Sequence, residues 1–170
     1  EMAYLGLFTV GVARFAAGDC DGAIARFGGA LSQTAERVPA LDQNIVYRKR
    51  GVAYHYKGDY DRAIADYDQA IQLQPDDVLA YYDRGVAYIL KGDYDRAIAN
   101  FNQAIQLQPD YTDAHVGRGV AYYDKGDYDC AISNYDQAIQ LKPNLAVAYN
   151  NRGNAYDAKD DTDHAIRTGL

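Results

Sequence analysis

Apolar and small side chains recur along the chain with the spacing of one face of an α-helix. Within residues 44–77, Tyr47, Gly51 and Tyr54 fall at i, i+4 and i+7, and this spacing predicts an amphipathic helix. A second stripe follows at i, i+4, i+7 and i+8, and consists of Ala63, Tyr67, Ala70 and Ile71. The pattern therefore predicts two consecutive helices, each with one face toward a shared core.

The residues between and after these stripes predict where the two helices begin and end. Gly58 follows the first stripe and suits the left-handed residue that ends a helix, and Asp59 suits the cap of the next one. Pro75 cannot continue the second helix, and Asp77 offers a cap for a helix after it. Residues 44–77 are thus predicted to form a helix hairpin.

The hairpin pattern repeats along the chain. Gly51, Gly85, Gly119 and Gly153 are spaced by 34 residues, and a fixed period of this size is typical of stacked-repeat proteins. A diverged copy precedes them, and its Gly11 lies 40 residues before Gly51. We predict a single array over residues 1–170, with a divergent repeat (4–37), an insertion (38–43), three repeats (44–77, 78–111 and 112–145) and an incomplete repeat (146–170) that stops within its second helix.

The repeated columns resemble the signature of the tetratricopeptide repeat family. In one copy these columns are Gly51, Ala53, Tyr54, Gly58, Ala63, Tyr67, Ala70 and Pro75. The resemblance recurs in phase from residue 44 to about residue 166. It implies an all-α fold, a right-handed α-solenoid of antiparallel helix hairpins, and a role in binding other proteins.

An arginine precedes the column glycine in four copies, at Arg50, Arg84, Arg118 and Arg152. We expect each arginine to bury its aliphatic stem and to direct its guanidinium to a carboxylate or to the surface. The candidate carboxylates, Asp68 and Asp136, lie late in the preceding second helices, and Asn102 at the same position is a weaker partner. This arrangement predicts a structural role for the arginines.

Composition and charge narrow the range of partners. The chain has 17 basic and 24 acidic residues, a net charge of −7, which disfavours nucleic acid as a partner. The apolar stretch at residues 3–17 is short and contains Arg14, so we expect no insertion into a membrane. Cys20 and Cys130 stand in non-adjacent repeats and predict no disulfide. These features favour a cytoplasmic location.

Catalytic and metal sites are not expected. Asp59 and Asp61 recur with the repeat period at helix starts, where a carboxylate serves as a cap and interacts favourably with the helix dipole. The three histidines, His55, His115 and His164, occupy different repeats without a second ligand at metal-binding spacing. We therefore predict that the chain is not an enzyme and has no cofactor.

A second face of each first helix is expected to line a concave groove. Turning about 100° from the Tyr47–Gly51–Tyr54 stripe reaches this face. The candidate peptide-binding residues on it are Arg48, Val52, His55, Tyr82, Val86, Ile89, Val120, Tyr123, Asp124, Asn150 and Asn154. An exposed apolar strip usually marks a binding site. For the three valines, the alternative is packing between adjacent first helices.

Two functional hypotheses remain open. The first is a protein–protein interaction module whose groove binds an apolar or amphipathic segment of a partner protein. The alternative is a self-assembling scaffold that uses the incomplete last repeat to form a homo-oligomer. Family members that bind chaperone C-termini carry a lysine, arginine and asparagine clamp, whereas this groove has Tyr82, Asp83 and Val116 after Arg48 and Lys49. Chaperone tails are therefore disfavoured as partners.

Overall fold

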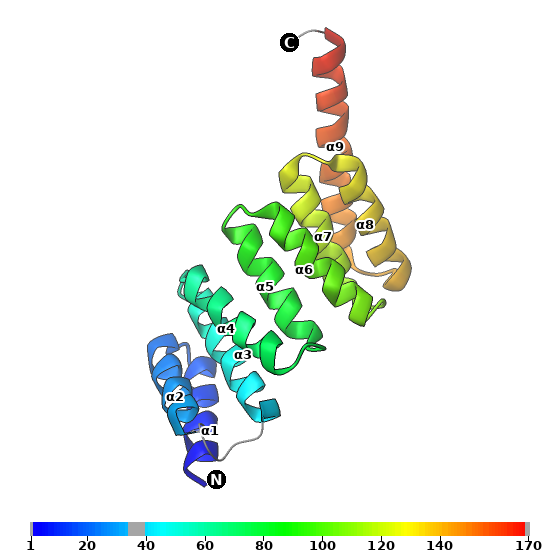
Figure 1. The fold of residues 1–170 in the computed structure, drawn as a ribbon. Coiled ribbons are helices and arrows are strands. Elements are labelled where there is room, and N and C mark those ends of the chain that lie inside the picture. Colours follow the sequence, from blue (N-terminus) through cyan, green and yellow to red (C-terminus); the bar gives the residue numbers. More distant parts are fainter. Residues whose placement is uncertain (1, 34–39, 169–170) are drawn as a thin grey trace. The chain divides into compact units, whose positions relative to one another are not determined.

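A computed structural model describes residues 2–33 and 40–168, and every regular element in these ranges is an α-helix (Figure 1). The predicted all-α fold of consecutive antiparallel hairpins is therefore confirmed. The helices pack into two units, Glu1–Lys91 and Gly92–Leu170. The repeat boundaries themselves stay predictions. Residues 34–39 span the predicted boundary between the divergent repeat and the insertion, and they lie outside the described residues.

The first unit contains two complete hairpins and a fifth helix. Helix α1 pairs with α2 and α3 pairs with α4, while α2 also packs on α3 and α4 on α5. Their bounds are α1 (Met2–Ala16), α2 (Cys20–Gln33), α3 (Ala40–Tyr56), α4 (Tyr60–Leu73) and α5 (Val78–Leu90). One core cluster joins α1, α2 and α3 through Tyr4, Ala23, Phe27, Ala30, Val46 and Ala53.

The second unit has four helices. Helix α6 packs on α7, α7 pairs with α8, and α9 packs on α8. Their bounds are α6 (Tyr94–Leu107), α7 (Thr112–Lys125), α8 (Tyr128–Leu141) and α9 (Ala146–Thr168). A core cluster forms around Ala131, Ile132, Tyr135 and Ala155.

The turn residues act as the sequence predicts. Gly58 and Gly126 have φ of +77° and +86°, the left-handed conformation that glycine adopts without steric cost. Asp59 then caps α4 by accepting from the backbone N–H of Arg62 at 3.2 Å. Asp93 and Asp127 cap α6 and α8 in the same way. Each turn thus ends one helix and starts the next within three residues.

The column glycines Gly51 and Gly119 each let an aromatic ring pack inside their hairpin. A Cβ added to Gly51 would lie 2.7 Å from the ring of Tyr67 and 3.2 Å from the carbonyl oxygen of Ala63. Gly119 stands in the same relation to the ring of Tyr135, at 2.5 Å. Both rings are 1% exposed. The first helix thus approaches the second closely at Gly51 and Ala63, and the glycine makes room for the ring.

The prediction of a separate second helix in the last repeat is wrong. Helix α9 runs without a break from Ala146 to Thr168. Gly58, Gly92 and Gly126 end the first helices of earlier copies in the left-handed conformation, whereas the corresponding position in the last copy is Asp160. A side chain at Cβ disfavours that conformation, so the helix continues.

The arginine column is paired as predicted. Arg84 Nη1 donates to Asp68 Oδ1 and Arg152 Nη1 donates to Asp136 Oδ1, both at 2.5 Å. Arg118 donates to Asn102 Oδ1 at 2.6 Å and also to Asn134 Oδ1 at 2.6 Å. Arg50 differs, because it forms a bidentate ion pair with Asp66 of the following helix, with N···O distances of 2.6 and 2.7 Å. These pairs tie each first helix to a neighbouring second helix.

A second series of ion pairs was not predicted. The lysine six residues after the column glycine pairs with an aspartate in the first turn of the preceding second helix. The pairs are Lys57–Asp21, Lys91–Asp61, Lys125–Asp95 and Lys159–Asp129. All eight side chains are at least a third exposed, so solvent screens each pair and its contribution to stability is small. Their regular spacing indicates that they help to fix the register between consecutive hairpins.

Candidate functional site

The candidate groove residues of the first unit surround a pocket between α3, α4 and α5, which we call the α3–α5 pocket. Val52 and His55 of α3 and Tyr82 and Val86 of α5 line it. Three further residues complete the lining: Tyr56, Tyr67 and Asp83. The cavity has a volume of about 240 Å³. It is mostly apolar and aromatic with few polar groups, as ligand pockets usually are.

Charged groups of α3 and α5 lie at one side of this pocket. The Arg48 guanidinium is 3.4 Å from Asp77 Oδ2 through Nε and 3.8 Å from Asp83 Oδ2 through Nη1. Its side chain is only 17% exposed, and its Nε makes no hydrogen bond. Arg48, one of the candidate peptide-binding residues, therefore pairs with two carboxylates of its own chain and is largely covered.

Burial raises the pKa of Asp83 to about 6, although the charge of Arg48 opposes this shift. The folded state thus binds the Asp83 proton more tightly than the unfolded state does. The resulting stabilisation is present below the ordinary pKa of aspartate and is lost as the pH rises through about 6.

We expect the free energy of unfolding to fall by about 2–3 kcal/mol more in the native protein than in an Asp83→Asn variant between pH 4 and pH 7. Urea unfolding of both proteins across this range measures the difference. Other carboxyl groups titrate in both proteins and cancel. Parallel stability curves would contradict the buried, proton-binding state of Asp83.

Aromatic side chains of α3 and α4 form another part of the pocket wall. The His55 ring lies 5.8 Å from the Tyr56 ring and 5.6 Å from the Tyr60 ring. Burial lowers the pKa of His55, so its imidazole is neutral at pH 7. Burial also raises the pKa of Tyr67, whose phenol stays protonated. This wall is therefore an uncharged aromatic surface.

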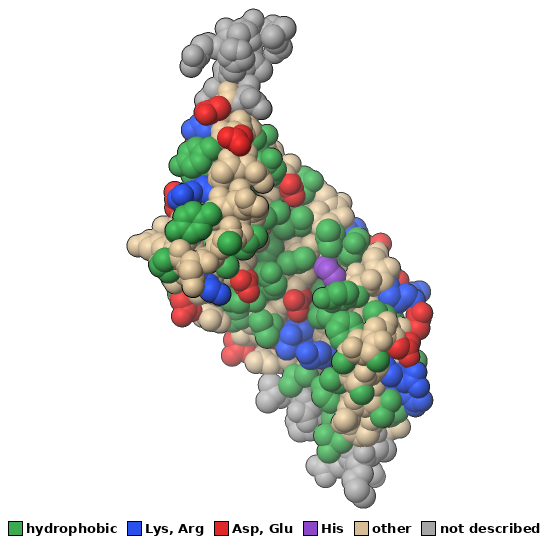
Figure 2. Space-filling view, turned by 180° about the vertical axis from the view of Figure 1, so that it is seen from behind, with side chains coloured by type: hydrophobic (Ala, Val, Ile, Leu, Met, Phe, Trp, Pro, Cys, Tyr) green, Lys and Arg blue, Asp and Glu red, His purple; other side chains and the backbone are tan. Residues whose placement is uncertain are grey.

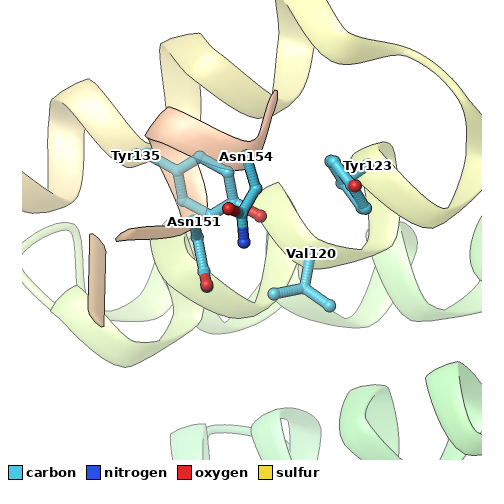
Figure 3. Close-up of a pocket in the computed structure, with 5 residues that line it drawn as sticks. All are labelled: Val120, Tyr123, Tyr135, Asn151 and Asn154. Carbon is cyan, nitrogen blue, oxygen red and sulfur yellow. The ribbon is translucent and has the colours of Figure 1, made fainter. Parts of the chain in front are cut away.

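The second unit contains a smaller pocket between α7, α8 and α9, which we call the α7–α9 pocket. Figure 3 shows Val120 and Tyr123 of α7, Tyr135 of α8, and Asn151 and Asn154 of α9 around it. Its volume is about 120 Å³. The two amide side chains give this pocket donors and acceptors but no charge.

The structure brings together seven of the eleven candidate residues, four in one pocket and three in the other. Arg48 lies beside the α3–α5 pocket, and the remaining candidates, Ile89, Asp124 and Asn150, line neither pocket. The candidate list did not include five other lining residues, although Asp83 was placed in the groove: Tyr56, Tyr67, Asp83, Tyr135 and Asn151. The helical period held a signal for Asp83 and Asn151, because each stands three residues before a predicted residue of the same face, Val86 or Asn154.

The surface and the remaining side chains offer little other chemistry. Figure 2 shows hydrophobic side chains exposed among acidic and basic ones on one face. Within the described residues, no cluster of three histidine, cysteine or carboxylate side chains could hold a metal ion. None of the helices in those residues is both long and apolar enough to span a bilayer. Cys20 and Cys130 are free.

Two sequence models of one family match the chain. One, described as tetratricopeptide repeat, matches residues 48–112, and another, described as TPR repeat, matches residues 119–160. No curated protein matches the sequence.

Solved structures of the same kind resemble the chain over most of its length. A crystal structure of MamA protein is 29% identical, covers 97% of this chain and 87% of its own, and has a TM-score of 0.80. The second TPR domain of human RPAP3, solved in complex with the HSP70 peptide SGPTIEEVD, is 26% identical, covers 69% of this chain and 98% of its own, and has a TM-score of 0.67. The first TPR of Spaghetti (RPAP3), bound to the HSP90 peptide SRMEEVD, is 26% identical over 71% of this chain and 95% of its own, with a TM-score of 0.68. With matched repeats over well over half of its length and a fold of consecutive hairpins, the chain belongs to the tetratricopeptide repeat family.

Proposed function

We propose that the chain is a protein-interaction module that binds an apolar or amphipathic segment of a partner protein on its first-helix faces. The observation that carries this proposal is that both units hold the same pocket. The five residues of the α7–α9 pocket lie 68 residues, or two repeat periods, after five residues of the α3–α5 pocket. The pairs are Val52 and Val120, His55 and Tyr123, Tyr67 and Tyr135, Asp83 and Asn151, and Val86 and Asn154.

This repetition indicates a site that the repeat architecture builds in each unit, where two first helices flank a second helix. A valine and an aromatic residue supply an apolar floor in both cases. The α5 or α9 side chains differ, since Asp83 and Val86 are replaced by Asn151 and Asn154. We infer that each pocket receives an apolar side chain of the partner and that these variable positions set specificity.

The excess of acidic residues in the chain, a net charge of −7, favours a partner with basic ends. The guanidinium of Arg48 is occupied by Asp77 and Asp83, so it is not available to a partner carboxylate. The peptides bound to the two RPAP3 domains end in Glu-Glu-Val-Asp. We propose that this chain differs from those domains and takes a basic-ended rather than an acidic-ended segment. The proposal includes no catalytic activity, because the repeated carboxylates serve as caps and ion-pair partners.

Selection of peptides from a random display library against the purified protein tests this proposal. Enriched peptides should be apolar or amphipathic with basic ends. Titration of such a peptide should shift the NMR signals of the Val52, Val86 and Val120 methyl groups and leave those of Val10 unchanged, since Val10 lies on α1 and lines neither pocket. Shifts confined to Val10 would count against the proposal, as would a library that yields no such peptide.

The self-assembling scaffold is a second candidate, favoured by the exposed apolar side chains of the last helix. Val147, Tyr149 and Tyr156 of α9 are 49%, 44% and 48% exposed. Association through this helix would produce a mass above that of the monomer at micromolar concentration. Light scattering measures that mass directly, and a monomer at every concentration would contradict the scaffold.

A further inference from the structure

The α3–α5 pocket contains one carboxylate in an otherwise uncharged lining. Asp83 is the one charged side chain among the described residues that line the cavity, since burial keeps His55 neutral at pH 7. The rest of the lining is apolar or aromatic and consists of Val52, His55, Tyr56, Tyr67, Tyr82 and Val86. The pocket thus combines an apolar surface with a single negative charge.

The charge of Asp83 is only partly balanced by the protein itself. Oδ2 of Asp83 lies 3.8 Å from Nη1 of Arg48, which is too far for a hydrogen bond. The same guanidinium is closer to Asp77, at 3.4 Å through Nε. Lys49 also attracts the Asp83 charge, but less strongly than Asp77 repels it. One guanidinium therefore faces two carboxylates, and a further cation beside Asp83 would be stabilised.

Asp77 is already satisfied, so Asp83 is the carboxylate that remains for a ligand. Asp77 caps α5 by accepting from the backbone N–H of Ala80 at 3.1 Å, and its Oδ2 accepts from Asn44 Nδ2 at 3.0 Å. The Asp77 side chain is 10% exposed, whereas that of Asp83 is 23% exposed and lines the cavity. A cation that enters the pocket therefore meets Asp83.

The protonation of Asp83 agrees with this incomplete balance. Burial raises the pKa of Asp83 to about 6, because the folded protein stabilises its carboxylate less well than water does. A cation at contact distance favours the ionised form of a carboxyl group. Binding of a cation and ionisation of Asp83 would therefore reinforce each other.

The size and lining of the pocket select a cation on an apolar stem. Its volume of about 240 Å³ is below the range of about 300–1,000 Å³ that is typical of small-molecule sites, and it suits a single side chain. Val52 and Val86 offer apolar surface, along which the stem of a lysine can lie. The faces of the surrounding tyrosine rings attract a cation.

The geometry at Asp83 favours an ammonium over a guanidinium. Oδ2 of Asp83 faces Arg48, so the carboxylate is not free to pair through both oxygens. A guanidinium binds best to two carboxylate oxygens at once, whereas an ammonium binds as a compact point charge. The side chain that fits this pocket is therefore lysine.

The α7–α9 pocket lacks this chemistry. Asn151 stands there in place of Asp83, and Asn154 in place of Val86. An amide carries no charge that would attract an ammonium, and the apolar surface supplied by Val86 is absent. A preference for lysine is thus confined to the pocket of the first unit.

We propose that the α3–α5 pocket is a lysine-binding site, in which one lysine of the partner segment places its ammonium against Asp83. This inference rests on the proposed function and deepens it, because the apolar part that enters this pocket is the stem of that lysine. The α7–α9 pocket takes a side chain without charge.

Isothermal titration of the peptide selected from the display library tests the proposal. Each lysine of the peptide is replaced in turn by norleucine, which keeps the stem but lacks the ammonium. We expect one replacement to lower the affinity for the native protein at least about tenfold, and the affinity for an Asp83→Asn variant less than about twofold. Asp110→Asn is the matched control, since Asp110 is exposed and lines neither pocket, and it should keep the tenfold loss.

Three results would overturn this inference and leave the proposed function standing. Selected peptides without lysine, or norleucine copies that all bind as tightly as the parent, would show that the pocket does not bind an ammonium. A tenfold loss that persists in Asp83→Asn, with its helix content confirmed by circular dichroism, would place the lysine elsewhere. Tighter binding after arginine replaces that lysine would assign the pocket to a guanidinium. The proposed function itself fails if the peptide leaves the Val52 and Val86 methyl signals unchanged.

Discussion

Replacement of Gly119 by leucine is expected to destabilise the protein by about 3 kcal/mol or more, and replacement by alanine by about 1–3 kcal/mol. Even the alanine Cβ would lie 2.5 Å from Cε1 of Tyr135. The Tyr135 ring is 1% exposed, so it cannot swing into solvent to make room. Leucine would force α7 and α8 apart, and the coupling between neighbouring helices would spread the damage. Thermal unfolding followed by circular dichroism measures both effects.

Gly153→Ala is the matched control for this experiment. It occupies the same column of the repeat, but its Cβ position is open. Alanine is favoured over glycine in a helix by about 1 kcal/mol, so this variant should melt at the same temperature as the native protein or slightly higher. If Gly119→Leu melts with the native protein, the assigned contact between column glycine and ring is wrong.

Local chemistry explains how much of the fold could be predicted from the sequence. The 34-residue period, the left-handed glycine at Gly58 and the cap at Asp59 are set by residues close together in the chain. The end of the array was predicted wrongly because Asp160 replaces a turn glycine, and the period alone carries no information about that single position. A repeat pattern therefore predicts a hairpin only where its turn residue is also present.

The candidate site was predicted less completely, for a different physical reason. The helical period identifies which residues share a face, and it placed Val52, Tyr82 and Val86 together. It does not say which charges pair, so the contacts of Arg48 with Asp77 and Asp83 were not predicted. The lysine–aspartate pairs were missed likewise, because they join residues 30 or 36 positions apart, as in Lys125 and Asp95.

Removal of the Tyr82 and Tyr123 rings is expected to weaken partner binding strongly. Each tyrosine lines one pocket, and truncation of a buried aromatic anchor typically costs about 2 kcal/mol or more in binding free energy. The combined variant Tyr82→Ala with Tyr123→Ala should therefore weaken binding of a library-selected peptide by at least about 100-fold. Helix content should change little, because both rings are only half-buried and Tyr123 packs against the edge of its core cluster.

The affinity of this double variant is the most direct test of the claim that first-helix faces bind the partner. The matched control is Gln72→Ala with Gln106→Ala, which changes two exposed side chains on second helices. Our account predicts that isothermal titration of the selected peptide shows the loss in the tyrosine variant and native affinity in the glutamine variant. Native affinity in the tyrosine variant, with loss in the glutamine variant, would contradict it.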